Sequence, residues 1–293
     1  MRRQFVATLE HLLNEDSRVV LLLGDIGVFG FRNSFAKFPT RTINIGILEQ
    51  ATVSVAAGLA KEGLIPVFHS IAPFVVERAY EQLKIDFCYQ TLGGNFVSVG
   101  ASYDYAALGC THHCPADVSL MKSLPGMQIV VPGHPSELDT LFRQSYANGC
   151  PTYFRLTERN NDVNHDVEFG KATVIQRGDA LTLVVVGPLL DTVTRAVGGL
   201  NLTILYYTTL CPFDSATLAE NCPSGKVVVV EPFYEGTMVN DVVASFKYRP
   251  VFITNIGVPR RFLTNYGTAE EHDIACGLTA EAIRRKVEEC IHA

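Results

Sequence analysis

The sequence predicts an α/β protein of two consecutive domains, each built on a mainly parallel β-sheet flanked by helices. Strand-like apolar runs alternate with segments of helical periodicity along the whole chain, which is typical of this class. A chain of 293 residues lies near the upper limit for one hydrophobic core, so two domains are expected. A polar stretch rich in Asn and Asp, residues 157–166, interrupts the alternation and indicates a connection between domains.

We expect the first domain over residues 1–160, a linker over 161–175 and the second domain over 176–293. In the first domain, segments with helical spacing of apolar residues predict helices, and short β-branched or aromatic runs predict strands. The expected helices there are 5–14, 51–61, 75–89, 118–123 and 136–146, and the expected strands are 19–23, 43–46, 66–70, 96–100, 128–131 and 152–156.

The same alternation resumes in the second domain with a smaller set of elements. The last expected helix begins at Thr279, a residue type that caps helix N-termini. The expected strands are 181–186, 202–206, 226–230 and 251–256, and the expected helices are 190–197, 215–220, 239–246 and 279–290.

Bulk composition narrows the function classes. A net charge of −6 argues against a nucleic-acid or anionic-membrane surface. No uncharged apolar run reaches membrane-spanning length, and Glu10 comes too early for a signal peptide. Eight scattered cysteines without a Cys-x-x-Cys pair predict no disulfide framework, so we expect a reducing cytoplasm. A mean hydropathy of +0.17 hints at apolar surface that meets a partner.

Two acidic residues follow predicted strands directly. Asp25 comes after strand 19–23, and Glu49 lies between strand 43–46 and a helix of small residues. Open α/β sheets bind ligands at the carboxyl ends of their strands, so both carboxylates are candidate ligand contacts. The alternatives are a turn aspartate and a glutamate favoured by the dipole of a first helical turn.

Two further segments carry candidate chemistry. Phe74 precedes the run Arg78-Ala-Tyr-Glu-Gln-Leu, for which ordinary helix packing is the alternative. The run Cys110-Thr-His-His-Cys114 holds the ligand types of a zinc site. Four ligands within five residues cannot easily converge on one tetrahedral ion, so no metal site is predicted here.

Together these segments resemble the transketolase and deoxyxylulose-phosphate synthase superfamily. The resemblance lies in residues 38–50, in the run from Phe74 through Arg78-Ala-Tyr-Glu-Gln-Leu, and in Gly109-Cys-Thr-His-His before Asp117-Val-Ser. It covers nearly the whole chain, but only the C-terminal half of the full architecture. It implies a thiamine-diphosphate pyrimidine-binding domain followed by a transketolase C-terminal-like domain, with thiamine diphosphate as the cofactor.

The resemblance also implies roles for individual residues. Glu49 would hydrogen-bond the aminopyrimidine ring and Phe74 would stack on it. His112 would face the reacting centre, where an imidazole can orient a carbonyl or carry a proton. The implied catalytic residues are Glu49 and His112; the implied cofactor contacts are Asp25, Ile26, Ile47, Glu49 and Phe74; the implied substrate contacts are His112, His113, Arg155 and Arg159.

The predicted role of two arginines, one in strand 152–156 and one just after it, comes from the resemblance. Relatives carry an arginine there that reaches a substrate phosphate or carboxylate, a task suited to a bidentate guanidinium. Arg155 aligns directly, whereas Arg159 aligns only with a one-residue shift. A surface salt bridge is the alternative for both.

The chain departs from the family pattern in three places. Residues 106–109 replace a segment with an aspartate that recognises a substrate hydroxyl, and Gly100 and Ala101 stand where a basic residue is usual. The substrate therefore does not carry over from the family. The third departure is that no Gly-Asp-Gly…Asn motif is present to hold diphosphate and a metal; Gly24-Asp25-Ile26-Gly27 lacks the continuation.

The missing Gly-Asp-Gly…Asn motif predicts a companion subunit. It would hold the diphosphate and Mg²⁺ in an α2β2 assembly, and the enzyme would transfer a ketol or acyl unit from a ketose, sugar phosphate or 2-oxoacid to an aldehyde. The alternatives are a β subunit of a 2-oxoacid dehydrogenase, a non-catalytic scaffold for a thiamine-binding partner, and a free-standing flavodoxin-like domain.

Overall fold

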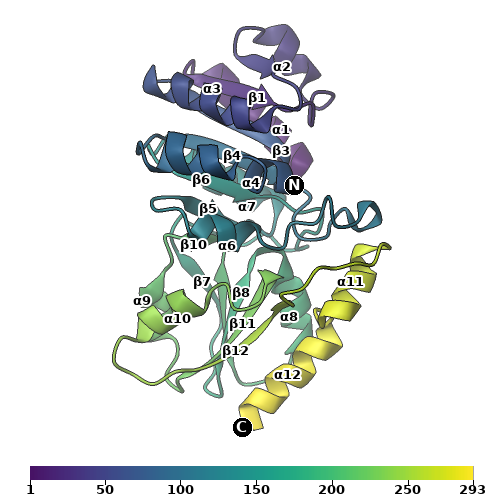
Figure 1. The fold of residues 1–293 in the computed structure, drawn as a ribbon. Coiled ribbons are helices and arrows are strands. Elements are labelled where there is room, and N and C mark those ends of the chain that lie inside the picture. The colour runs from purple at the N-terminus through teal and green to yellow at the C-terminus, as the bar shows by residue number, and fades with distance from the viewer. Residues whose placement is uncertain (293) are drawn as a thin grey trace.

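A computed structural model describes residues 1–292 and contains a seven-stranded and a five-stranded β-sheet, each flanked by helices. Figure 1 shows the first sheet at the top and the second below it, with the C-terminal helices along one side. The predicted α/β class with two mainly parallel sheets is confirmed. None of the helices formed by the described residues has both the length and the apolar character that crossing a membrane requires.

The first sheet has the strand order β10-β5-β6-β4-β3-β1-β2, with every neighbouring pair parallel except β10 and β5. Its elements are α1 (Arg2–Glu15), β1 (Val19–Leu23), α2 (Arg32–Lys37), β2 (Thr42–Asn44), α3 (Glu49–Lys61), β3 (Ile65–Ile71), α4 (Ala72–Val76), α5 (Tyr80–Gln82), η1 (Leu83–Cys88), β4 (Gly94–Val99), η2 (Ala106–Leu108), α6 (Asp117–Lys122), β5 (Gln128–Val130), α7 (Pro135–Ser145) and β6 (Pro151–Arg155).

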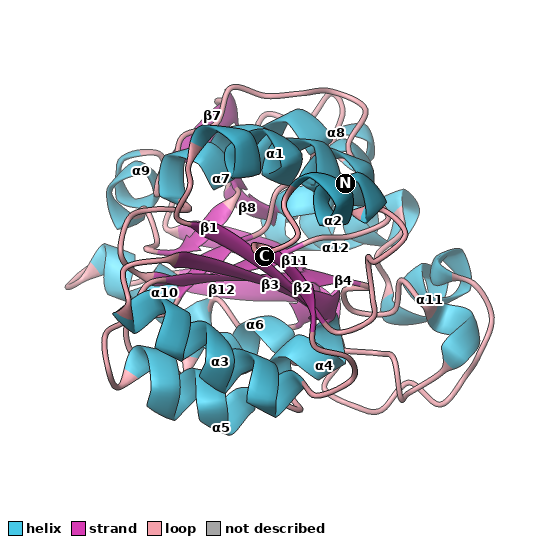
Figure 2. Ribbon diagram, turned by 90° about the horizontal axis from the view of Figure 1, so that it is seen from above, coloured by secondary structure: helices cyan, strands magenta, loops and turns pink. Residues whose placement is uncertain are grey.

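Burial on both faces explains why these strands are so apolar. All five residues of β1 are buried, as expected for a parallel strand covered by helices on each side. Figure 2 shows α1 and α7 over one face and α3, α4, α5 and α6 over the other. The adjacent parallel strands β4, β3, β1 and β2 therefore end at the same edge of the sheet.

The second sheet has the order β12-β11-β8-β9-β7, and only the β7–β9 pair is antiparallel. Its elements are β7 (Ala172–Gln176), β8 (Thr182–Val186), η3 (Gly187–Leu189), α8 (Leu190–Ala196), β9 (Thr203–Tyr207), α9 (Ser215–Glu220), β11 (Lys226–Tyr234), α10 (Val239–Phe246), β12 (Phe252–Val258), α11 (Ala269–Cys276) and α12 (Ala280–His292).

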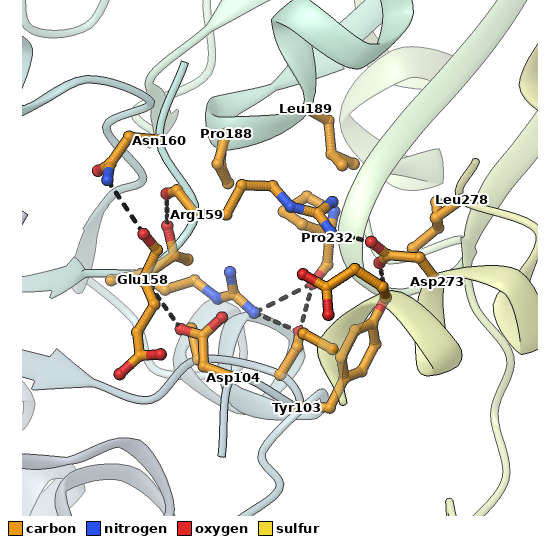
Figure 3. Close-up of a pocket in the computed structure, with 16 residues that line it drawn as sticks. Tyr103, Asp104, Glu158, Arg159, Asn160, Pro188, Leu189, Pro232, Asp273 and Leu278 are labelled. Atoms are coloured by element: carbon orange, nitrogen blue, oxygen red, sulfur yellow. Dashed lines mark hydrogen bonds and ion pairs between the residues drawn. The ribbon is translucent and has the colours of Figure 1, made fainter. Parts of the chain in front are cut away.

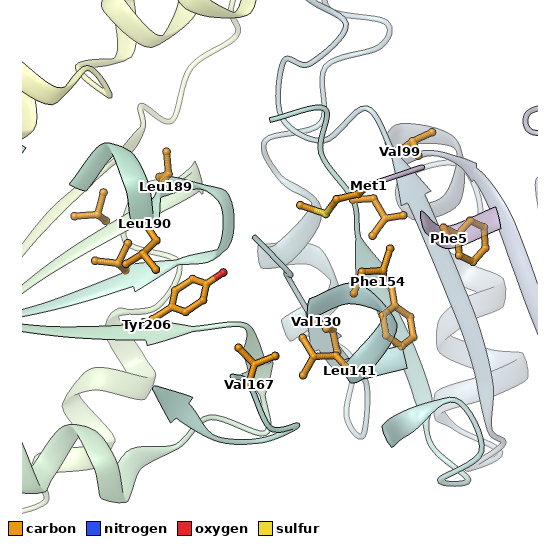
Figure 4. Packing of buried hydrophobic residues seen from close by; sticks show 14 of the residues in the cluster. Met1, Phe5, Val99, Val130, Leu141, Phe154, Val167, Leu189, Leu190 and Tyr206 are labelled. Carbon is orange, nitrogen blue, oxygen red and sulfur yellow. The ribbon is translucent and has the colours of Figure 1, made fainter. Parts of the chain in front are cut away.

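The two sheets share more than a linker. Strand β10 (Thr209–Cys211) comes from the second half of the chain but pairs with β5 of the first sheet. One buried cluster runs from Phe5 and Phe154 beneath the first sheet to Leu190 and Tyr206 beneath the second (Figure 4). Continuous burial of this kind ties the two sheets together.

The connecting segment packs more tightly than its polarity suggests. Asn161 is buried, and its Nδ2 donates to the Gly187 carbonyl oxygen at 3.1 Å. A residue of the polar stretch 157–166 is thus packed in the interior, because its amide finds a hydrogen-bond partner there. Strand β7 begins at Ala172, inside the range expected for the linker.

The single helix expected over residues 75–89 is also wrong. The segment contains α4, then a turn, then α5 and the π-helical η1. Some backbone hydrogen bonds in this segment join residues five positions apart: the Arg78 N–H donates to the Pro73 carbonyl, and the Tyr89 N–H donates to the Lys84 carbonyl. A five-residue step replaces the usual four, and such steps are frequent at functional sites.

Candidate active site

Glu49 lies at the carboxyl edge of the first sheet as the first residue of α3, and its side chain is 1% exposed. Its Oε2 accepts a hydrogen bond from Arg78 Nη1 at 2.8 Å. Its Oε1 is buried without a hydrogen-bond partner among the described residues. An unsatisfied buried carboxylate oxygen costs free energy, so a bound group that donates a hydrogen bond to Oε1 would be stabilised there.

Arg78 connects Glu49 to an aromatic side chain. The Arg78 guanidinium carbon lies 4.1 Å from the centre of the half-buried Phe74 ring. Phe74 in turn meets the His112 ring edge-on, with 5.6 Å between ring centres. The structure therefore brings Glu49, Phe74 and His112 together, through an arginine that the sequence prediction did not include. The sequence signal that could have identified Arg78 is its position four residues after Phe74.

The ends of β1 and β2 are joined by reciprocal side-chain bonds. Asp25 has a positive φ of 63°, and its N–H donates to Asn44 Oδ1 at 2.9 Å, while Asn44 Nδ2 donates to Asp25 Oδ1 at 2.8 Å. Asp25 is thus fixed at the same edge as Glu49, two positions beyond β1. Ile26 is half-buried against the core, and Ile47 is 64% exposed beside Glu49.

Glu49, Arg78 and Phe74, here called the Glu49 group, fit the aminopyrimidine end of thiamine diphosphate. This group offers a carboxylate oxygen that can accept a hydrogen bond and receives none from the described residues, beside a partly exposed aromatic ring, and both contacts suit an aminopyrimidine. Arg78 balances the Glu49 charge without using Oε1. Both features are properties of this chain alone.

The two adjacent histidines face different ways. His112 Nδ1 lies 3.0 Å from Thr111 Oγ1, and its ring contacts Phe74. His113 is buried, and its ring meets His272 edge-on at 5.3 Å between centres. The structure does not bring His113 to the Glu49 group. Diverging rings also argue against a shared metal ion in residues 110–114.

Arg155 lies inside the molecule. It is fully buried, and its Nε donates to Asp117 Oδ2 at 2.7 Å, while its Nη2 donates to Ser102 Oγ at 2.6 Å and to the Pro232 carbonyl at 3.1 Å. The surface salt bridge considered for Arg155 is wrong, because both charges are removed from water. These hydrogen bonds join Arg155 Nε and Nη2 to the protein itself rather than presenting the two atoms to a substrate.

Arg159 is 30% exposed and pairs with Asp273 of α11. Both arginines line a cavity of about 360 Å³ between the two sheets, together with Asp104, Glu158 and other residues shown in Figure 3. The lining does not include Glu49, Phe74 or His112. The predicted substrate arginines therefore surround a space of their own.

The carboxyl group of Asp104, which lines this cavity, has a raised pKa. Burial raises the pKa of its carboxyl from 3.8 to about 7, although its Oδ2 accepts the Glu158 N–H at 3.0 Å. As the pH rises from about 4 to about 7, the unfolded chain loses this proton before the folded chain does. The free energy of unfolding therefore falls over that range.

Replacing Asp104 by asparagine should remove this penalty while keeping an acceptor for the Glu158 N–H. We expect the Tm of Asp104→Asn to exceed that of the wild type by a few degrees at pH 8, with a gap that shrinks toward pH 5. Thermal unfolding at both pH values measures the difference. A gap that is equal at the two pH values would contradict the assignment.

Comparison with known proteins agrees with this geometry. Residues 1–163 match the family described as transketolase, pyrimidine binding domain. An uncharacterized 33.6 kDa protein in the fasciation locus of Rhodococcoides fascians is 38% identical over 97% of this chain and 92% of its own length. An apulose-4-phosphate transketolase subunit from Actinobacillus succinogenes is 30% identical over 71% of each chain.

A solved structure described as a split-gene transketolase, inactive β4 tetramer, has a TM-score of 0.85 and 27% identity, covering 99% of this chain and 97% of that one. The family match spans more than half of the described residues, and the similarity to split transketolases extends through the second sheet. The chain therefore belongs to the transketolase superfamily of thiamine-diphosphate-dependent transferases, and it corresponds to the C-terminal half of that family's full architecture.

Proposed function

We propose that this chain is one subunit of a split transketolase-like enzyme that transfers a ketol or acyl unit from a ketose or 2-oxoacid to an aldehyde. The observation that carries the proposal is the buried Glu49 Oε1, which accepts no hydrogen bond from residues 1–292 and lies near the half-buried Phe74 ring. The similarity to an apulose-4-phosphate transketolase subunit supports the same reaction class.

Thiamine diphosphate, when bound, supplies the nucleophile that attacks a carbonyl carbon. Glu49 would hold a hydrogen bond at the pyrimidine ring, with Arg78 keeping the carboxylate oriented. Phe74 would stack on that ring, with Asp25 and Ile26 at the neighbouring strand end. His112 would orient the substrate carbonyl or carry a proton, because its Nδ1 lies beside Thr111 and its Nε2 has no partner among the described side chains.

We further propose that a companion subunit holds the diphosphate and Mg²⁺ in an α2β2 assembly. Ile47 and Leu48, 64% and 57% exposed, lie next to Glu49 and offer an apolar surface where a partner would close the site. The related split-gene transketolase is described as inactive as a β4 tetramer, which also supports a partner requirement. Arg159 remains the candidate for an anionic substrate group, because it is partly exposed.

The experiment that tests this proposal compares the purified chain with the reconstituted complex. We expect the chain alone to show no transfer activity and little Mg²⁺-dependent thiamine-diphosphate binding by calorimetry, and co-expression with the companion to restore both. Ile47→Glu should weaken assembly, whereas Ile274→Glu on the equally exposed surface of α11 should not. Tight Mg²⁺-dependent binding by the lone chain would refute the split arrangement.

The acceptor separates two enzyme classes. A 2-oxoacid dehydrogenase β subunit would pass an acyl unit to a lipoyl group, whereas a transketolase-like subunit passes a ketol unit to an aldehyde. The transketolase subunits among the relatives favour the aldehyde acceptor. Assaying the complex with a lipoylated domain and with short aldehydes in parallel distinguishes them.

A further inference from the structure

The loop that carries His112 is held at its base by a short antiparallel bridge. Residues 103–113 leave β4 and return before α6, and Ser102 pairs with Cys114, whose N–H donates to the Ser102 carbonyl at 2.7 Å. Below this bridge, Ser102 Oγ donates to the Pro232 carbonyl, and the Tyr234 N–H donates to the Pro115 carbonyl at 3.0 Å. Strand β11 of the second sheet therefore supports the base of the loop.

The two loop residues next to this bridge, Tyr103 and His113, contact a different part of the second half of the chain. The Tyr103 hydroxyl donates to Asp273 Oδ1 at 2.6 Å, and the His113 ring packs on His272. Figure 3 shows the Tyr103 ring pointing toward Asp273 at one side of the cavity. Both Asp273 and His272 belong to α11, which begins with a capping box formed by Thr268 and Glu271.

A third contact lies on the N-terminal side of His112, at Gly109. Gly109 has a φ of 72°, and a Cβ built there would stand 2.7 Å from Tyr266 Cε1. The backbone of the loop thus approaches the Tyr266 ring as closely as a glycine permits. These contacts lie on both sides of His112, at Gly109 and His113.

We propose that residues 266–273 form a clamp, here called the α11 clamp, that holds the His112 loop and so directs His112 toward Phe74 and the reacting centre. Asp273 is its central positioning residue, because one carboxylate joins Tyr103 of the loop and Arg159 beyond β6. This inference rests on the proposed function, and it gives the second half of the chain a role in the reaction. Neither Tyr103 nor Asp273 touches the Glu49 group.

The geometry explains why one hydroxyl should matter. Besides the 3₁₀ turn η2, the backbone between Tyr103 and His113 makes local turn hydrogen bonds, such as the one from the His112 N–H to the Gly109 carbonyl at 3.0 Å. These bonds do not join the loop to other elements, so its placement against them depends on contacts made by its side chains. Tyr103 and Asp273 are both buried, so losing their hydrogen bond leaves a carboxylate oxygen without its donor.

The test uses Tyr103→Phe, which removes the hydroxyl but leaves the Arg159–Asp273 pair intact. In the reconstituted complex we expect kcat to fall about 10- to 100-fold, as small misplacement of a catalytic group does, with the half-saturating concentration of thiamine diphosphate unchanged. Asp273→Asn should have the same sign of effect. Ile274→Ala, on the exposed face of the same helix, should match the wild type in every measurement.

Hydrogen–deuterium exchange of peptides covering 103–113 gives a second readout that does not depend on activity. Measured on the full chain with and without its companion, exchange should quicken in Tyr103→Phe and Asp273→Asn and stay unchanged in Ile274→Ala. Unchanged exchange in Tyr103→Phe would overturn the clamp, and quicker exchange with unchanged kcat would overturn its role in positioning His112. If the wild-type complex shows no transfer, the proposed function fails, while the exchange result still decides whether the clamp exists.

Discussion

Replacing Glu49 by glutamine should reduce kcat of the complex by about three orders of magnitude, within the range expected for loss of a general acid–base contact. The amide keeps the size of the side chain but has no negative charge to stabilise a protonated pyrimidine. It also exchanges the ion pair with Arg78 for a neutral contact. Steady-state transfer assays of the reconstituted complex measure the loss.

The matched control is Glu62→Gln, the same chemical change at the exposed C-terminal end of α3. We expect that variant to retain full activity. Both variants should assemble with the companion and keep the wild-type Tm within a few degrees, since Arg78 is more than one-third exposed and can be hydrated. Normal turnover by Glu49→Gln in an assembled complex would exclude Glu49 from the reaction.

Removing Asp117 should cost more stability than the other single changes described for this protein. Asp117 Oδ2 accepts from Arg155 Nε and from the Tyr153 hydroxyl at 3.0 Å, and Asp117 Oδ1 accepts the Val118 N–H at 2.8 Å. Asp117→Ala leaves a fully buried guanidinium without a counter-charge. A change of this kind destabilises proteins by about 3–5 kcal/mol, so we expect little folded protein at 37 °C.

The double variant Asp117→Leu/Arg155→Leu should be more stable than either single variant, because no charge stays buried alone. The control is Glu288→Ala, which breaks the surface pair with Arg284 and should change the free energy of unfolding by about 0.5 kcal/mol or less. Thermal and urea unfolding of these variants measure the differences. Wild-type stability in Asp117→Ala would contradict the importance of this buried pair.

The Arg155 network also relates the two sheets to each other. Arg155 is the last residue of β6 in the first sheet, and Pro232 belongs to β11 in the second. The segment predicted as a linker runs between them. The stability of the first sheet should therefore depend on the second, which agrees with the shared buried cluster in Figure 4.

The sequence by itself determined the features that depend on neighbouring residues. Strand β1 and helices α9 and α10 have the predicted bounds, because the local pattern of apolar and polar residues marks where each of these elements begins and ends. The sequence predicts Glu49 just before a helix over residues 51–61, and the structure starts that helix two residues earlier, with Glu49 as its first residue. The spacing of Thr268 and Glu271 is that of a capping box, so the sequence also held a signal for the start of α11.

Only the tertiary structure decided which distant residues meet. Tyr103 and Asp273 are 170 residues apart, and β10 joins a sheet whose other strands come from the first half of the chain. The same is true of Arg155, whose residue type suggested the surface but whose partners from α6 and β11 hold it in the interior. Such contacts leave no periodic trace in the sequence, because they depend on chain topology and on hydrogen-bond partners that arrive only on folding.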